Sequence, residues 1–259
     1  MVSLFILKEN VIKIRKMRVS IHQPHYLPWL PLIYKIITSE VFVFLDHINY
    51  SKNDWVNRNK LKNANGSFLL TIPIKKKSGK MIIKEISIYG DGWREKHLKG
   101  FYYNYNSAMY FDDIFPFLEE IYRREWIHVS EINYAMLKWV IGFLKSDVMV
   151  IKSSELGLCS IKNDLLIDIC KIVGATEYIT GKYGYENYLD RQLFEKNDIS
   201  IRPIEWNCPI YIQCYENKGF IPNLSIFDLL MNYGSNSKSI LLQGGRLEYA
   251  TRRDTDNSG

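Results

Sequence analysis

The chain has 259 residues, of which 47% are hydrophobic and 24% charged, a composition typical of a globular protein large enough to bury a core. Its formal net charge of +6 is compatible with anionic ligands such as nucleotides, but no run of lysine and arginine is long enough to predict binding to nucleic acid. The sequence contains no run of about 18 apolar residues, so we expect no stable membrane insertion. The four cysteines form no CxxC pair, so we predict no zinc site and favour a reducing, cytoplasmic setting.

The predicted fold opens with a strand–loop–helix–strand unit. Residues 18–22 have strand character, residues 29–38 carry apolar side chains at helical spacing, and residues 41–45 form a continuous apolar run of strand length. A Rossmann-like βαβ unit of this kind gathers ligands at the carboxyl ends of its strands, where His22 and Asp46 stand. We therefore expect the functional site at this edge of the sheet.

The rest of the chain alternates short apolar runs with amphipathic segments, which predicts a single α/β domain with a mostly parallel central sheet flanked by helices. Further strands are expected at 67–74, 82–88, 148–152, 178–181 and 200–206, and helices at 112–122, 130–144, 162–173, 188–196 and 224–232. We assign the domain to residues 18–235, between an N-terminal extension (1–17) and a partly disordered C-terminal tail (236–259).

Two residues at the strand ends are the candidates for catalysis. His22 lies in a loop held by prolines and can act as an acid or base or bind a phosphate, unless it is a structural histidine bonded to the backbone. Asp46 can orient a histidine, coordinate a metal or hold an amine or a ribose hydroxyl, or it can simply cap the strand end. Gln23, His25 and Tyr26 share the His22 loop, and we count Gln23 and Tyr26 among the substrate contacts.

A polar stretch after the second predicted strand supplies further candidates for substrate binding. An arginine suits a phosphate or a carboxylate because its guanidinium group is planar, so a nucleotide diphosphate would fit here. The alternative is a solvated helix surface. The candidates of this stretch are Ser51, Lys52, Trp55, Asn57, Arg58 and Asn59.

Later segments add other candidates. Trp93 and His97 are four residues apart, so a helix would place both on one face, with core packing as the alternative for Trp93. Residues 180–184 read as a glycine-containing turn whose N–H groups could meet an anion, although the pattern is neither a P-loop nor a dinucleotide fingerprint. The substrate-binding candidates from these segments are His97, Asn104, Tyr105, Gly181 and Tyr188.

Several sequence blocks are distinctive in combination. They include HQPHYLPW, FVFLDHINYSKNDWVNRNKLK, LLTIPI, WREKHLKGFYYNY, YITGKYGYENYLD and PIYIQ, in this order within residues 18–235. In them the chain resembles the WbqC-like family of bacterial proteins, which implies a role in building surface glycans such as O-antigen and lipopolysaccharide. The family pattern favours His22, Gln23 and Pro24 over His25.

The C-terminal block departs from the family pattern at one position. Where the resemblance implies a histidine, this chain carries Cys208. The cysteine is either a filler or a substitute nucleophile, and we favour the filler.

The resemblance and the polar candidates together lead to a functional hypothesis. We expect a cytoplasmic transferase of surface-glycan biosynthesis that N-acylates an amino sugar carried on a nucleotide, with an acyl-CoA, an acyl carrier or ATP as the second substrate. The alternatives are an ATP-dependent nucleotidyl-transfer or adenylate-forming enzyme and a non-catalytic protein that binds a sugar nucleotide. In each case the partner is a small molecule, not a nucleic acid.

Overall fold

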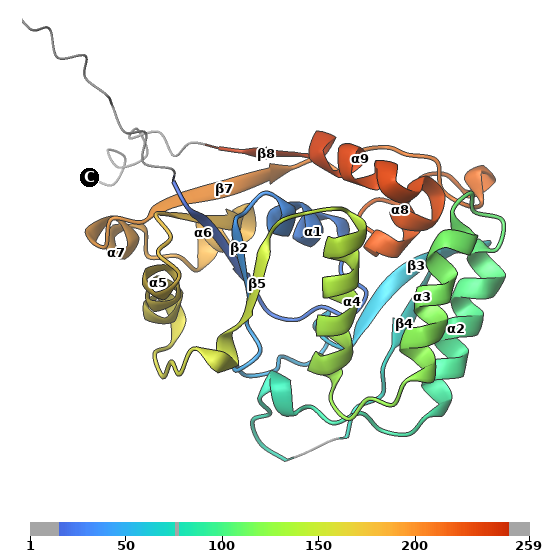
Figure 1. Cartoon of the computed structure of the whole chain (residues 1–259), viewed down its shortest axis with the longest axis horizontal. Coiled ribbons are helices and arrows are strands. Elements are labelled where there is room, and N and C mark those ends of the chain that lie inside the picture. The colour runs from blue at the N-terminus through green and yellow to red at the C-terminus, as the bar shows by residue number, and fades with distance from the viewer. Residues whose placement is uncertain (1–15, 76–77, 249–259) are drawn as a thin grey trace, which may run out of the picture.

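A central sheet of six strands organises the computed structural model, which describes residues 16–75 and 78–248 (Figure 1). The strand order is β5-β2-β1-β6-β7-β8, and all neighbouring pairs are parallel except β7 and β8. The α/β class and the mostly parallel sheet are therefore confirmed. The strands span Arg18–His22 (β1), Val41–Phe44 (β2), Met149–Lys152 (β5), Glu177–Gly181 (β6), Ser200–Trp206 (β7) and Gly245–Leu247 (β8).

Helices cover both faces of this sheet (Figure 1). Val19 and Ile21 of β1 pack in one core cluster with α5 and α7, whereas Phe42 and Phe44 of β2 pack in another with α1, α4, α8 and α9. Burial on both faces explains why β2 is a continuous apolar run. The helices span Leu30–Ile37 (α1), Gly92–Tyr105 (α2), Phe111–Arg123 (α3), Val129–Phe143 (α4), Lys162–Ile172 (α5), Lys182–Asn187 (α6), Arg191–Lys196 (α7), Ile226–Tyr233 (α8) and Ser237–Gln243 (α9), and 3-10 turns span Ile83–Glu85, Ser153–Glu155, Glu216–Lys218 and Gly234–Asn236.

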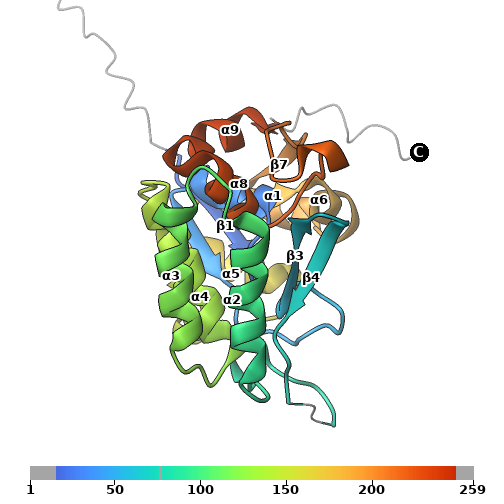
Figure 2. The same ribbon diagram turned by 90° about the vertical axis from the view of Figure 1, so that its right-hand side faces the viewer.

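An antiparallel hairpin of β3 (Arg58–Asn63) and β4 (Gly66–Thr71) lies beside α2 (Figure 2). Leu61 and Leu70 of the hairpin belong to the same core cluster as α1 and α4. The hairpin therefore joins the sheet through a shared core and is not a separate domain. None of the described helices is both long and apolar enough to cross a bilayer.

Two local expectations were wrong. Residues 82–88 do not form a strand but contain the 3-10 turn Ile83–Glu85, which buries Ile83 and the following Ile86, three positions apart, in the core. Residues 180–184 are not a turn, since β6 passes directly into α6. For the polar stretch of residues 51–62, the alternative of a helix surface is also excluded, because residues from Arg58 onward form strand β3.

Residues at both ends of the described part of the chain contact or extend the sheet. The carbonyl of Met17 accepts hydrogen bonds from the backbone of Thr176 and Glu177. Residues 237–247, which we assigned to the C-terminal tail, form α9 and β8. The remainder of the expected extension and tail, residues 1–15 and 249–259, lies outside the described residues.

The junction of α9 and β8 yields a prediction about packing. Gly245 lies against the ring of Tyr34 on α1, and a β-carbon at this position would overlap the ring. We expect Gly245→Ala to lower the free energy of unfolding by about 1–3 kcal/mol, the usual cost of overpacking. Chemical denaturation measures the change.

Gly142→Ala is the matched control for this substitution. No atom lies within 4 Å of a β-carbon added to Gly142 in α4, and alanine is the better helix former. The control should leave stability unchanged or raise it by up to about 1 kcal/mol. Equal stabilities of the two variants would contradict the packing assigned to Gly245.

Candidate functional site

The carboxyl end of β1 lies where the order of the sheet reverses. The chain passes from β1 to β2 and β5 on one side and then returns to place β6 and β7 on the other side. The register sets His22 level with Phe44 of β2, and its continuation sets His22 level with Gly181 of β6. Open α/β sheets bind ligands in the crevice at such a switch point. We therefore place the candidate site here.

A lysine of α1 occupies the gap between β1 and β6. The described pairing of these strands ends at Ser20 and Ile179, and Lys35 Nζ donates a hydrogen bond to the next carbonyl on β1, that of Ile21, at 2.8 Å. Lys35 is 6% exposed, and this burial lowers its pKa to about 7. Sequence reasoning missed Lys35, although a single lysine in the apolar helix LPLIYKII was a visible signal.

His22 is partly exposed and presents one ring nitrogen as a base. Its Nδ1 lies 3.0 Å from the carbonyl oxygen of Gln23. Because a carbonyl only accepts, Nδ1 carries the proton and Nε2 of the neutral ring carries the lone pair. Burial, followed by the charges of Lys35 and His25, lowers the pKa of His22 well below its usual value near 6.5. The ring is therefore neutral at pH 7, the form that accepts a proton.

The loop after β1 is bound to the segment that precedes β3. Gln23 Nε2 donates a hydrogen bond to Asp54 Oδ2 at 2.6 Å, and the backbone N–H of Tyr26 donates to the carbonyl of Trp55 at 3.0 Å. The structure thus brings together the two segments from which most of the predicted site residues come.

Two asparagines of the predicted set hold the backbone of this junction. Asn59 donates hydrogen bonds to the carbonyls of Tyr26 and Leu27 at 3.2 and 2.6 Å, and Asn57 donates to the carbonyl of Ile72 at 2.8 Å. Both side chains are buried. They fix the loop and the hairpin in place, a role that their exposed neighbours do not share.

The other polar residues of this segment are open to solvent. Ser51 and Lys52 are exposed, and Trp55 and Arg58 are half-buried. Arg58 donates a hydrogen bond to the carbonyl of Asn53. Lys52 and Arg58 therefore offer cationic groups within a few residues of Asp54 in the sequence.

Tyr26 and His97 lie beneath the loop. The hydroxyl of Tyr26 is 2.7 Å from Nδ1 of His97 and also contacts the hydroxyl of Tyr122. All three side chains are buried, and burial lowers the pKa of His97 to about 3. These hydrogen bonds support the loop from the core. Tyr26 and His97, which we predicted to be substrate contacts, are closed to solvent.

Asp46 binds the end of β5. Its carboxylate accepts hydrogen bonds from the hydroxyls of Ser153 and Ser154 at 3.1 and 2.9 Å and from the N–H of Ser154 at 2.9 Å. Nδ1 of His47 lies 2.6 Å from the hydroxyl of Ser153. Within the described residues no hydrogen bond joins Asp46 to His22, so the carboxylate positions the ends of β2 and β5.

Tyr105 belongs to a second buried polar cluster. Its hydroxyl donates to Asp228 Oδ1 at 2.7 Å, while the hydroxyl of Tyr211 and Nε2 of Gln213 donate to Asp228 Oδ2 at 2.7 and 2.9 Å. Burial raises the pKa of the Asp228 carboxyl, and the side chain is fully buried. The cluster ties the PIYIQ block to α2 and α8.

The remaining predicted contacts lie in three different places. Gly181 precedes α6 at the end of β6, next to the switch point. Tyr188 is exposed, and its ring stands 5.4 Å from that of Tyr183. Asn104 is half-buried and donates to the carbonyl of Gly100 at 2.7 Å.

The structure favours neither a nucleophilic role for Cys208 nor a metal site among the described residues. The sulfur of Cys208 accepts a hydrogen bond from the N–H of Asn223 at 3.3 Å, and burial raises the pKa of the thiol, which disfavours the nucleophilic thiolate. Over the ranges 16–75 and 78–248, no three His, Cys, Asp or Glu side chains gather in a way that could hold a metal ion.

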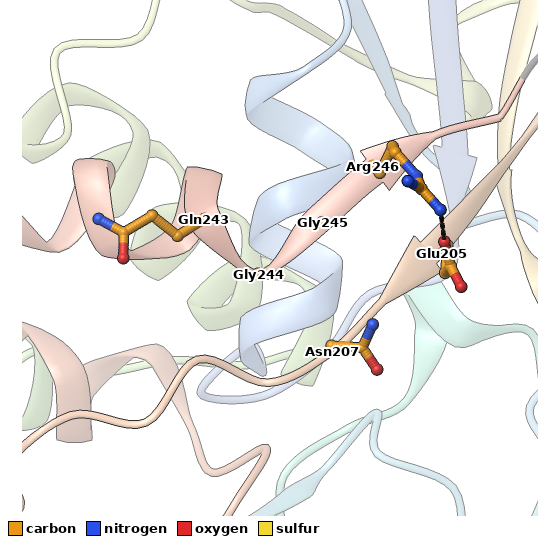
Figure 3. Close-up of a pocket in the computed structure, with 6 residues that line it drawn as sticks. All are labelled: Glu205, Asn207, Gln243, Gly244, Gly245 and Arg246. Carbon is orange, nitrogen blue, oxygen red and sulfur yellow. Dashed lines mark hydrogen bonds and ion pairs between the residues drawn. The ribbon is translucent and has the colours of Figure 1, made fainter.

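A shallow pocket of about 270 Å³ lies at the end of β7, two strands from β1 (Figure 3). An ion pair between Arg246 and Glu205 forms part of its wall. The pocket is lined by Glu205, Asn207, Gln243, Gly244, Gly245 and Arg246.

Comparison with known proteins shows which family the chain belongs to. The model of the WbqC-like protein family matches residues 23–240. An uncharacterized protein of Mycobacterium tuberculosis is 30% identical over 227 residues, which cover 86% of this chain and 97% of that protein. No solved structure matches the chain.

The buried neutral histidines predict an acid-sensitive fold. Burial lowers the pKa of His25 and of His97 to about 3, whereas each would titrate near 6.5 in the unfolded chain. The unfolded state therefore binds more protons between these values, so the stability that these residues contribute is complete above about pH 6.5 and is lost as the pH falls. Between pH 6 and pH 5 each should lower the free energy of unfolding by about 1 kcal/mol.

Urea denaturation across this range checks the prediction with a matched pair of variants. His97→Gln removes one buried imidazole and should reduce the decline by about 1 kcal/mol per pH unit. Gly142→Ala in α4 leaves every histidine in place and is the control, which should keep the wild-type slope. Identical slopes for the wild type and His97→Gln would contradict the assignment.

Proposed function

The chain belongs to the WbqC-like protein family, and from this premise we propose that it is a transferase of bacterial surface-glycan biosynthesis that N-acylates an amino sugar carried on a nucleotide. The observation that carries the proposal is the neutral His22 ring, whose Nε2 is available as a base at the switch point of the sheet. The glycan setting comes from the family resemblance of the sequence.

The proposed reaction requires a base that is neutral near pH 7. The amine nitrogen of the sugar attacks the carbonyl carbon of an acyl thioester, and a C–N bond forms as the C–S bond breaks and the thiolate leaves. The nitrogen must lose a proton in this step. His22 Nε2 accepts that proton and passes it to the thiolate, so that the enzyme returns to its starting state.

Gln23 is fixed for contact with the sugar. Its Nε2 donates to Asp54 Oδ2, which leaves the amide oxygen as an acceptor for a hydroxyl or an amine N–H. Asp54 is held in turn, because its Oδ1 accepts from the N–H of Trp55 at 2.7 Å. A preorganised acceptor beside the base can align the amine for attack.

The strand order supports a nucleotide as the carrier of the sugar. Counted along the chain, the five parallel strands stand in the order third, second, first, fourth, fifth. This is the order of dinucleotide-binding α/β folds, whose ligands lie at the switch point. Lys52 and Arg58 are the cationic residues that we assign to the diphosphate.

The same strand order favours a second candidate, an ATP-dependent nucleotidyl-transfer or adenylate-forming enzyme. In that case His22 would contact a phosphate of ATP and would not take a proton from an amine. The argument rests on the likeness of fold and loop position.

Two assays separate these candidates. Release of free thiol from an acyl-CoA that depends on a nucleotide-linked amino sugar supports N-acylation, whereas release of pyrophosphate from ATP in the presence of a sugar phosphate supports nucleotidyl transfer. A thermal shift with the nucleotide sugar but no turnover in either assay would contradict both enzymes and leave a binding protein.

Substitution of the base predicts a loss of turnover. His22→Gln keeps a polar side chain but removes the proton acceptor, so we expect kcat in the N-acylation assay to fall by about 10²–10⁴-fold. Because desolvation, the larger cause of the lowered His22 pKa, persists in the complex, the ring stays neutral and the wild-type kcat at saturating substrate should stay level between pH 7 and pH 8. Steady-state kinetics measure both effects.

His128→Gln provides the control for this experiment, since it alters a histidine of α4 that belongs to a helix cap. Its kcat should equal that of the wild type. If His22→Gln turns over as fast as the control, His22 is not the base.

A further inference from the structure

Lys35 carries a charge that the described residues do not balance. The hydrogen bond of its Nζ goes to the neutral carbonyl of Ile21, and none of the ion pairs among residues 16–75 and 78–248 involves it. An ammonium group has three donors, and a buried charge is normally paired. Two donors and the charge of Lys35 are therefore available to a ligand.

Lys62, the other buried lysine, shows the contrast. It is 1% exposed and also donates to a backbone carbonyl, that of Gly219, at 2.7 Å. It lies close enough to Asp228 for its charge to lower the pKa of that carboxyl, against the larger effect of burial. Lys62 thus has a carboxylate nearby, whereas burial alone accounts for the lowered pKa of Lys35.

Two neighbouring ring nitrogens are also unsatisfied. His25 Nδ1 and Trp29 Nε1 are buried and have no hydrogen-bond partner within the part of the chain that the structure describes. The His25 side chain is more than nine-tenths buried. The indole N–H can only donate, and buried donors are rarely left unpaired. The indole N–H therefore points to an acceptor that the chain itself does not provide, and His25 Nδ1 can donate to the same acceptor in the tautomer that carries its proton there.

These unsatisfied groups lie in one place. The ring centroids of His22 and His25 are 4.7 Å apart, and those of His25 and Trp29 are 6.3 Å apart. The charge of Lys35 lowers the pKa of both histidines, which requires Nζ to be near them. A cation, an indole N–H and an imidazole nitrogen that lie in one place without an acceptor suit an oxyanion.

We propose that Lys35, His25 and Trp29 form a subsite for a phosphate group of the substrate. Lys35 supplies the charge, and the two rings donate hydrogen bonds to the phosphate oxygens. The phosphate then lies beside His22. The subsite deepens the proposed function, on which it rests for the identity of the substrate as a nucleotide.

Protonation of Lys35 makes the subsite dependent on pH. Its pKa is about 7, so the charge that attracts the anion is lost as the pH rises above this value. Glu177 of β6 is already paired with Arg202 at 2.6 Å, and Asp54 accepts from Gln23. The charged groups and histidines on the surrounding elements include Arg18 and His22 of β1, His25 of the loop after it, Asp54 before β3, Glu177 of β6, Arg202 and Glu205 of β7, and Lys238 of α9.

Sulfate is the probe for this test, because it resembles phosphate but does not change its charge between pH 6 and pH 9. The indole N–H signal of Trp29 in a proton–nitrogen NMR spectrum reports on the subsite, and the signal is identified by its absence in Trp29→Phe. We expect saturable sulfate binding that moves this signal. The affinity should be highest below pH 7 and should fall by up to about tenfold per pH unit above it.

Variants of the two buried lysines provide the matched comparison. Lys35→Met should weaken sulfate binding at least tenfold, while Lys35→Arg should bind with little dependence on pH because its charge persists. Lys62→Met should bind as the wild type does. Thermal unfolding confirms that each variant is folded, and methionine suits the space of a buried lysine stem.

Several outcomes would overturn the subsite. They are the absence of saturable sulfate binding in the wild type, unchanged binding in Lys35→Met, and an equal loss in folded Lys62→Met. Acetate that binds as tightly as sulfate would overturn the assignment to phosphate. Because none of these measurements needs turnover, a failed acylation assay leaves the subsite standing, and failed sulfate binding leaves the acylation assay standing.

Discussion

The divergence of β1 from β6 is the constraint on which the site depends. Alternate residues of a parallel strand direct their backbone groups to alternate neighbours, and the carbonyl of His22 accepts from the N–H of Leu45 on the β2 side. The carbonyl of Ile21 therefore points toward β6, beyond the last described pair of the two strands. Lys35 satisfies this carbonyl, so the strands separate without an unpaired acceptor and an ammonium group enters the crevice.

Buried side-chain hydrogen bonds hold the rest of the site on this framework. The loop after β1 has no regular partner strand, so its carbonyls are bound by Asn59 from β3 and its tyrosine by His97 from α2. The Asp228 cluster fastens the hairpin side in the same way, because the N–H of Lys62 on β3 donates to the hydroxyl of Tyr105. Polar networks of this kind rigidify a fold only when every member is bonded.

The βαβ opening was predictable because its physical causes are local. A four-residue apolar run fits a strand buried on both faces, and prolines exclude a helix between β1 and α1. β3 was not predictable, since its sequence RNKLKN has no strand pattern and two of its buried residues, Asn59 and Lys62, are polar. Their burial depends on partners far away in the chain, which no local pattern contains.

The same reason explains which site residues the sequence could reveal. His22 stands at a strand end, a position visible in the sequence, whereas the partners of Asp46 lie more than 100 residues away in the 3-10 turn that follows β5. Because of these partners, Asp46 connects the ends of β2 and β5 and does not orient His22. The sequence shows Lys35 as a single lysine within an apolar helix. Only the structure shows that no carboxylate of the described residues pairs with it.

Lys35 and His22 are coupled in a way that suits a base which acts after the substrate has bound. Part of the lowering of the His22 pKa comes from the charge of Lys35, so an oxyanion beside Lys35 offsets that charge and raises the pKa of His22. A base is most effective when its pKa lies close to the working pH. Desolvation, the larger cause of the low pKa, remains. The anion nevertheless moves His22 in the useful direction, so binding of a phosphate and strengthening of the base become one event.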